Sequence, residues 1–259
     1  MLFQIKSYLK FLWKSENEHG VHSPFVFLLL TKCWYDKKNK AEYTVLNEYR
    51  KTLLRNTNTI EVSDFGAGSK IFKSNIRKVS AIAATAGISQ KRAELLFRVV
   101  QYYQPKTILE IGTSLGLATS AMALANPKAK ITTLEGCANT MSECELLLQK
   151  FDFKNVNCIT AEFESYFSSL DFQLLTFDFI YFDGNHSKKA TLRYFHHLLS
   201  TIRNDTVWIF DDIHWSSEME EAWEVIKQHP KVRVTIDSFQ WGFVFFRKEQ
   251  VKQHFILRT

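Results

Sequence analysis

The sequence is poor in cysteine and contains no long apolar run. Its four cysteines, in 259 residues, include no C-x-x-C pair, which does not suit a structural zinc site or a disulfide framework. The longest purely apolar run near the start is FVFLLL at 25–30, too short for the core of a signal peptide or for a membrane span. We therefore expect a cytoplasmic protein with reduced thiols and no transmembrane segment.

Charge is distributed unevenly along the chain. Residues 1–105 hold 17 Lys and Arg against 8 Asp and Glu, whereas residues 106–259 hold 16 against 19. A basic surface of this kind is either simply solvated or contacts an acidic partner, nucleic acid or lipid headgroups. Residues 1–105 thus form a basic N-terminal part, and residues 106–259 form a mildly acidic main part.

The opening MLFQIKSYLKFLWKS places lysines at four-residue intervals and apolar residues on the other side. This spacing predicts an amphipathic helix, whose apolar face can pack on the body, pair two subunits as a homodimer, or lie on a membrane surface. We predict that residues 1–80 form a basic helical cap. Within it, VSDFGAGSKIF at 62–72 carries Gly66 and Gly68, which we interpret as turn glycines shaping a loop over a pocket.

After residue 80 the chain alternates strand-like and helical patterns. Ser89 is placed to begin a helix that Pro105 ends, and five strand-like runs follow that are too apolar to have a wet side. Two more runs, at 231–239 and 241–248, have almost no spacer and predict an antiparallel hairpin. We therefore predict an α/β domain over 81–259: a doubly wound, mostly parallel, seven-stranded Rossmann-like sheet with an antiparallel last strand. The five runs are 107–111, 131–135, 156–160, 177–182 and 206–210.

The stretch LEIGTSLGLAT at 109–119 is a glycine-rich turn between a predicted strand and a predicted helix. It lacks the G-x-x-x-x-G-K-[ST] spacing, which disfavours a triphosphate. Glu135, 23 residues after Gly112, suits the ribose of a dinucleotide, but the tight G-x-G-x-x-G turn is absent. A glycine turn without a phosphate-binding spacing, followed by an acid at the end of the next strand, suits a cofactor that has a ribose but no phosphate.

ILEIGTSLG and ITTLEG resemble the first motif and the ribose-binding motif of class I S-adenosylmethionine-dependent methyltransferases, over about residues 90–248. The resemblance implies that the backbone at Gly112 and Gly116 approaches the amino-acid part of S-adenosylmethionine, that Glu110 orients the loop, and that Glu135 accepts the ribose hydroxyls. A nucleotide-sugar or dinucleotide site is the alternative. The implied cofactor residues are Glu110, Gly112, Thr113, Ser114, Gly116, Glu135, Glu162, Phe163 and Asp183.

Three aspartates, Asp183, Asp211 and Asp212, end two successive predicted strands. Carboxylates that converge without basic neighbours repel one another unless a cation compensates, and their oxygens suit Mg²⁺ or Mn²⁺. The arrangement is similar to metal-dependent O-methyltransferases of catechols, caffeoyl-coenzyme A and macrolide sugars, which implies that all three are metal ligands. Asp212, however, stands where the catechol enzymes have an amide. In the alternative, these aspartates cap helices or orient the cofactor amine.

Two histidines, His186 and His214, follow these aspartates closely. A histidine can remove the acceptor proton during methyl transfer. We predict an S-adenosylmethionine-dependent O-methyltransferase of a small hydroxylated acceptor, with Asp183, His186, Asp211 and His214 as catalytic residues. The alternatives are a non-catalytic S-adenosylmethionine-binding module and an RNA methyltransferase. No RNA-binding signature is present, which makes a nucleic-acid partner a weaker hypothesis.

Overall fold

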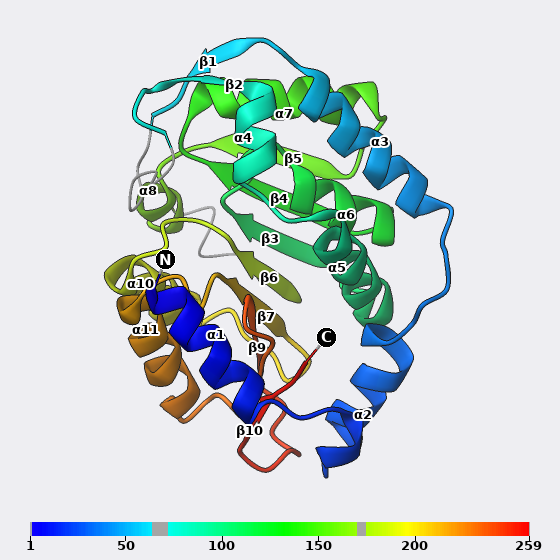
Figure 1. The fold of residues 1–259 in the computed structure, drawn as a ribbon, viewed down its shortest axis with the longest axis vertical. Coiled ribbons are helices and arrows are strands. Elements are labelled where there is room, and N and C mark those ends of the chain that lie inside the picture. Colours follow the sequence, from blue (N-terminus) through cyan, green and yellow to red (C-terminus); the bar gives the residue numbers. More distant parts are fainter. Residues whose placement is uncertain (1, 64–71, 170–174, 259) are drawn as a thin grey trace.

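A large mixed sheet runs through the molecule, and helices cover both of its faces (Figure 1). The computed structural model describes residues 2–63, 72–169 and 175–258. Across the sheet the strand order is β10-β8-β9-β7-β6-β3-β4-β5. The strands are β3 (Thr107–Ile111), β4 (Lys130–Glu135), β5 (Val156–Thr160), β6 (Phe179–Phe182), β7 (Val207–Asp211), β8 (Val234–Asp237), β9 (Trp241–Phe245) and β10 (Gln253–Ile256).

The predicted fold class is confirmed. Strands β3 to β7 pair in parallel, and β9 runs antiparallel to both β7 and β8. Within the described residues the sheet has eight strands instead of the expected seven, because β10 adds to the free edge of β8 in parallel. None of the four residues of β10 is fully buried, so its short sequence carries too weak an apolar pattern to predict a strand.

Side chains alternate between the two faces of the sheet and join two separate apolar cores. Ile108 belongs to one core and Leu109 to the other. Helices α5, α6 and α7 contribute to the first core, and α8, α10 and α11 cover the opposite face. This two-sided burial explains why β6 and β7 are almost continuously apolar. The helices are α5 (Gln90–Tyr103), α6 (Leu117–Ala125), α7 (Ala138–Lys150), α8 (Phe163–Phe167), α10 (Lys188–Leu198) and α11 (Ser217–Gln228).

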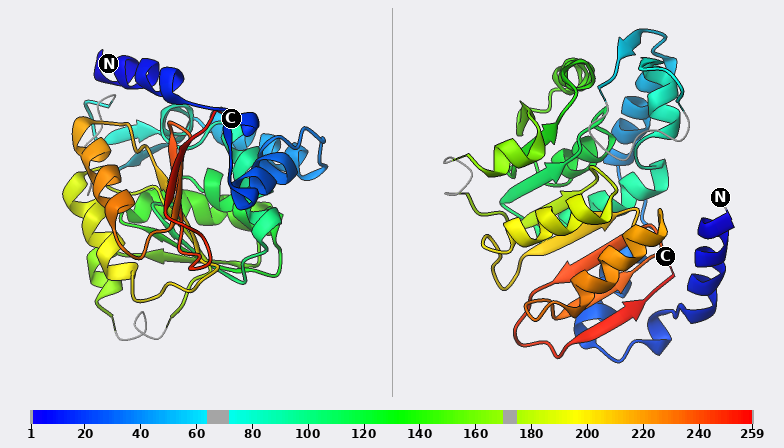
Figure 2. Two further views of the ribbon diagram at one scale, coloured as in Figure 1. Left: turned by 90° about the horizontal axis from the view of Figure 1, so that it is seen from below. Right: turned by 90° about the vertical axis from the view of Figure 1, so that its left-hand side faces the viewer.

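The residues before α5 divide into a part that joins the main core and a part that does not. Trp34 packs on Phe243 with ring centroids 5.0 Å apart, and Tyr49 is fully buried. By contrast, α1 lies along the outside of the molecule (Figure 2). The elements are α1 (Leu2–Lys14), η1 (Glu18–Gly20), α2 (Pro24–Leu29), the π-helical η2 (Leu30–Trp34), α3 (Glu42–Arg55), the paired strands β1 (Thr59–Glu61) and β2 (Ile76–Lys78), and α4 (Val79–Thr85).

The division of the chain into a cap over residues 1–80 and a domain after it stays a prediction. Within the predicted cap, α2 and α3 share their apolar core with the sheet. Ser89 caps α5 as expected, accepting a hydrogen bond from the Arg92 backbone N–H. Gly66 and Gly68 lie outside the described residues, and the loop predicted from them stays a prediction too.

Candidate active site

The glycine-rich loop between β3 and α6 is packed too closely for larger residues at its two glycines. Gly112 has a φ of +98°, and a Cβ there would lie 2.4 Å from the carbonyl oxygen of Asp183. Gly116 has a φ of +76°, and its Cβ would lie 2.6 Å from both Tyr49 Oη and Cys144 Sγ. Only glycine combines this backbone conformation with this proximity. The loop therefore follows β3 in a single, tightly held shape.

Glu135, at the carboxyl end of β4, lies directly beside this loop. Its carboxylate accepts the backbone N–H of Ser114 at 2.9 Å and that of Cys137 at 3.0 Å. The backbone N–H groups of Gly112 and Thr113 both donate to the Leu134 carbonyl, at 3.0 and 3.1 Å. Loop and acid thus form one hydrogen-bonded unit.

Glu110 lies beneath the loop and is fully buried. Its carboxylate accepts hydrogen bonds from the hydroxyls of Thr119 and Thr133, and Thr133 in turn pairs with the hydroxyl of Thr113. Burial raises the pKa of Glu110 to about 7, although the two threonine hydroxyls act in the opposite direction. This acid supports the loop from inside the protein.

We expect Glu110→Gln to remove a pH dependence of stability. The folded protein binds the Glu110 proton up to a pH of about 7, against 4.5 for the free side chain. The protonated Glu110 therefore contributes its full stabilisation below pH 4.5, and this contribution is lost as the pH rises through 7. The free energy of unfolding changes by about 3 kcal/mol over this range. In urea unfolding from pH 4 to 9, the free energy of unfolding of the variant should rise relative to that of the wild type as the pH rises. Parallel profiles would contradict the assignment, and the exposed Glu145→Gln is the matched control.

Glu162 and Phe163 follow β5 and lie at the start of α8. Phe163 faces the chain that leaves β6: a Cβ on Gly184 would lie only 2.5 Å from Phe163 Cε2. The Phe163 ring also meets Tyr194 edge-on, with centroids 5.9 Å apart. The segments after β3, β5 and β6 are thus brought together at one end of the sheet, as the sequence predicts.

A buried ion pair joins Asp211, at the end of β7, to Arg92 in the first turn of α5. The Arg92 guanidinium contacts Asp211 Oδ1, and the two side chains are 17% and 5% exposed. The same guanidinium lies over the Trp241 ring, 4.8 Å from its centroid. The sequence-based premise that the strand-end aspartates have no basic neighbour is therefore wrong. Arg92 lies 119 residues from Asp211, and only the packing of α5 on the sheet reveals the pair.

The three aspartates do not fit a divalent metal in this arrangement. Both carboxylate oxygens of Asp211 have protein partners: Oδ1 accepts the Asp212 N–H at 2.8 Å as well as Arg92, and Oδ2 accepts the Tyr181 hydroxyl at 3.2 Å. Arg92 already supplies the positive charge that these acids require. Among the residues that the structure describes, no cluster of three or more His, Cys, Asp or Glu is arranged to hold a metal ion.

The two predicted catalytic histidines have different surroundings. His186 Nε2 lies 3.6 Å from Asp183 Oδ1, and burial, together with the Asp211 carboxylate, raises the pKa of Asp183. His214 is held between two acids, with Nδ1 2.7 Å from Glu220 and Nε2 2.8 Å from Asp237. Burial alone would lower the pKa of His214, but these carboxylates raise it above its ordinary value. Both ring nitrogens of His214 are thus engaged.

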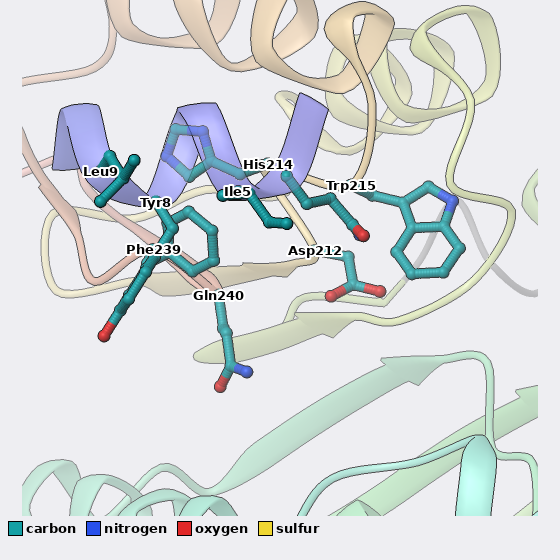
Figure 3. Close-up of a pocket in the computed structure, with 9 residues that line it drawn as sticks. Ile5, Tyr8, Leu9, Asp212, His214, Trp215, Phe239 and Gln240 are labelled. Atoms are coloured by element: carbon teal, nitrogen blue, oxygen red, sulfur yellow. The ribbon is translucent and has the colours of Figure 1, made fainter. Parts of the chain in front are cut away.

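A cavity of about 420 Å³ opens beside these acids, between α1 and the turns that follow β7 and β8 (Figure 3). Ile5, Tyr8 and Leu9 of α1 form an apolar wall, and Phe239 lies beside them. Asp212 and Gln240 bring polar groups to the same space. The lining residues are Gln4, Ile5, Tyr8, Leu9, Asp212, His214, Trp215, Phe239 and Gln240.

Comparison with known proteins agrees with this geometry. Residues 109–213, from the glycine loop to just beyond the end of β7, match the family described as a methyltransferase domain. The matched region covers 105 of the 259 residues and contains the glycine loop, Glu135 and the three aspartates. This confirms the resemblance to class I methyltransferases that the glycine loop and the acid of β4 indicate from the sequence. A search of curated proteins finds no match.

Solved methyltransferases share the fold over most of this chain. An O-methyltransferase from Bacillus cereus in complex with SAH is 17% identical, with a TM-score of 0.55 over 85% of this chain and 94% of that one. An SAH-bound methyltransferase from Podospora anserina is 14% identical, with a TM-score of 0.60 over 88% and 97%. The O-methyltransferase TomG from Streptomyces achromogenes, in complex with SAM, is 15% identical, with a TM-score of 0.56 over 90% and 99%.

Proposed function

We propose that this methyltransferase transfers the methyl group of S-adenosylmethionine to a hydroxyl oxygen of a small acceptor. The loop between β3 and α6 supports the cofactor most directly, because its glycines and the Glu135 carboxylate provide close backbone approach and an acceptor for ribose hydroxyls. Phe163, beside Gly184, offers an apolar surface for the adenine. The acceptor occupies the cavity beside Asp212, whose mixed apolar and polar lining suits a small organic molecule.

In this proposal the acceptor proton goes to His186. His186 lines a smaller cavity with Gly184 and Asp211 rather than the large one, so the acceptor hydroxyl has to lie between the two, beside Asp211 and Asp212. Methyl transfer displaces a neutral thioether from the methyl carbon, so the protein has to align the acceptor oxygen with that carbon and receive one proton. His186 lies close to Asp183, which can orient the imidazole. His214 has no ring nitrogen available for this step, since Glu220 and Asp237 engage both. We assign to His214 the positioning of the β7–α11 loop.

No divalent metal takes part in the proposed reaction. The reason is the Arg92–Asp211 ion pair, which supplies a cation where the sequence predicts a metal and uses the Asp211 oxygens. Arg92 thereby keeps the strand-end carboxylates together without an added ion.

Calorimetric titration with S-adenosylmethionine tests the cofactor assignment. We expect saturable binding by the wild type and a loss of at least tenfold in Glu135→Gln, because the amide replaces a charged acceptor of ribose hydroxyls with a neutral one. The exposed Glu145→Gln, in α7, is the matched control and should bind like the wild type. Absence of heat with the wild type, or equal binding by Glu135→Gln, would refute the site.

A further inference from the structure

Helix α1 exposes an apolar face that the rest of the chain does not cover. Six of the fifteen large hydrophobic residues that are exposed in the described structure lie on its thirteen residues. The others are spread over the surface in ones and twos, which is ordinary for a monomeric protein. Trp13 is 84% exposed and Leu2 is 77% exposed. Such a concentration on one short helix marks an interaction surface.

The exposed face lies on the side of α1 away from Phe11, although Ile5 and Leu9 also line the cavity. Phe11 is buried, and both Phe11 and Tyr8 contact the Phe239 ring, with centroids 5.5 and 4.8 Å away. The unattached face is formed by residues spaced three, four and three positions apart, which places them on one side of a helix. They are Leu2, Ile5, Leu9 and Leu12, with Trp13 beside them.

Charge on α1 indicates what this face meets. Lys6, Lys10 and Lys14 are all exposed and are successive at four-residue spacing, so they form a basic stripe along one edge of the apolar face. The helix contains no acidic residue. Two copies of α1 packed face to face would therefore bring like charges together with no carboxylate on either helix to pair with them.

We propose that α1 docks this protein on an anionic lipid surface. Leu, Ile and Trp side chains enter the boundary between headgroups and acyl chains while the lysines pair with lipid phosphates, the arrangement that interfacial helices adopt. No helix within the described residues has the length and apolar character needed to cross a membrane, and α1 lies in the plane of the surface instead. Because Ile5 and Leu9 also line the cavity, the cavity opens beside the lipid.

Vesicle sedimentation with the full chain tests this docking. We expect the wild type to pellet with vesicles of phosphatidylglycerol and phosphatidylcholine at least tenfold more strongly than with phosphatidylcholine alone, and added salt to weaken the binding. Leu2→Glu combined with Trp13→Glu should reduce binding at least tenfold. Neither residue lines the cavity. Leu146→Glu, 63% exposed on α7, is the matched control and should bind like the wild type.

Two other results would overturn the proposal. If the wild type ignores both kinds of vesicle, α1 is not a lipid-binding element. If the wild type is a dimer in analytical ultracentrifugation and the double variant is a monomer with unchanged vesicle binding, the apolar face joins two subunits instead. Circular dichroism and thermal unfolding of each variant establish that it remains folded. S-adenosylmethionine binding, measured separately, shows whether the active site is intact and keeps the two proposals distinguishable.

Discussion

Arg92→Met is expected to lower the free energy of unfolding by about 3–5 kcal/mol. The substitution leaves the Asp211 carboxylate, which is 5% exposed, without the guanidinium that neutralises it, and an uncompensated buried charge has a cost of this size. The cost should be evident in urea unfolding at neutral pH. We also expect methyl transfer to fall strongly, because the ends of β6 and β7 lose the charge that holds their aspartates together.

A second substitution distinguishes the ion pair from the packing of the arginine stem. Combining Arg92→Met with Asp211→Leu removes both charges, and apolar replacements of a buried pair are often neutral or stabilising. The double variant should therefore recover most of the lost stability. If Arg92→Met alone costs less than about 1 kcal/mol, the pair is not a structural element. Stabilisation of the wild type by added Mg²⁺ would instead support a metal at Asp183, Asp211 and Asp212.

Gly112→Ala is expected to abolish measurable S-adenosylmethionine binding. The new Cβ would lie 2.4 Å from the backbone oxygen of Asp183 and 2.6 Å from its carbonyl carbon. Neither atom belongs to a flexible side chain, so the loop after β3 or the chain after β6 has to move. Both segments form the proposed cofactor site, and a displacement of about 1 Å is enough to disrupt such a geometry. Calorimetry with the cofactor measures the loss.

Gly87→Ala provides the matched control. Gly87 has a φ of +103°, close to the +98° of Gly112, so both substitutions carry a similar backbone strain of about 1–3 kcal/mol. The nearest atom to a Cβ on Gly87, however, is the Leu117 Cδ1 methyl at 3.1 Å, which can move aside. We expect Gly87→Ala to lose stability but keep cofactor binding. Equal binding by Gly112→Ala and the wild type would refute the role of the loop.

Local sequence patterns predict most of the sheet and the glycine loop. The apolar runs correspond to β3 to β9 because burial on both faces makes most positions of the central strands apolar. The loop at Gly112 and the acid at Glu135 are recognisable because their requirements are local: a positive φ at one residue and a carboxylate at the end of the next strand. Such features depend on neighbouring residues rather than on the packing of distant segments.

Local sequence patterns do not predict features that depend on contacts between distant residues. Arg92 looks like an ordinary polar residue in the first turn of a helix, and only the packing of α5 places it on Asp211. His214 looks like an available base, yet Glu220 and Asp237, 6 and 23 residues away, enclose it. The amphipathic pattern of α1 predicts a helix but not which of its two apolar sides is covered.

Tyr49 matters for any attempt to produce the predicted domain, residues 81–259, without the segment before it. It belongs to α3, in the segment before the recognisable methyltransferase motifs, yet its hydroxyl donates to the Leu115 carbonyl at 3.0 Å, 66 residues later. Its ring fills space against Phe151. A fragment beginning after α3 would keep every sequence motif but would lose the Tyr49 contact behind the turn that we propose for the cofactor. We therefore expect a stable, working protein to require more of the chain than residues 109–213, which match the methyltransferase domain.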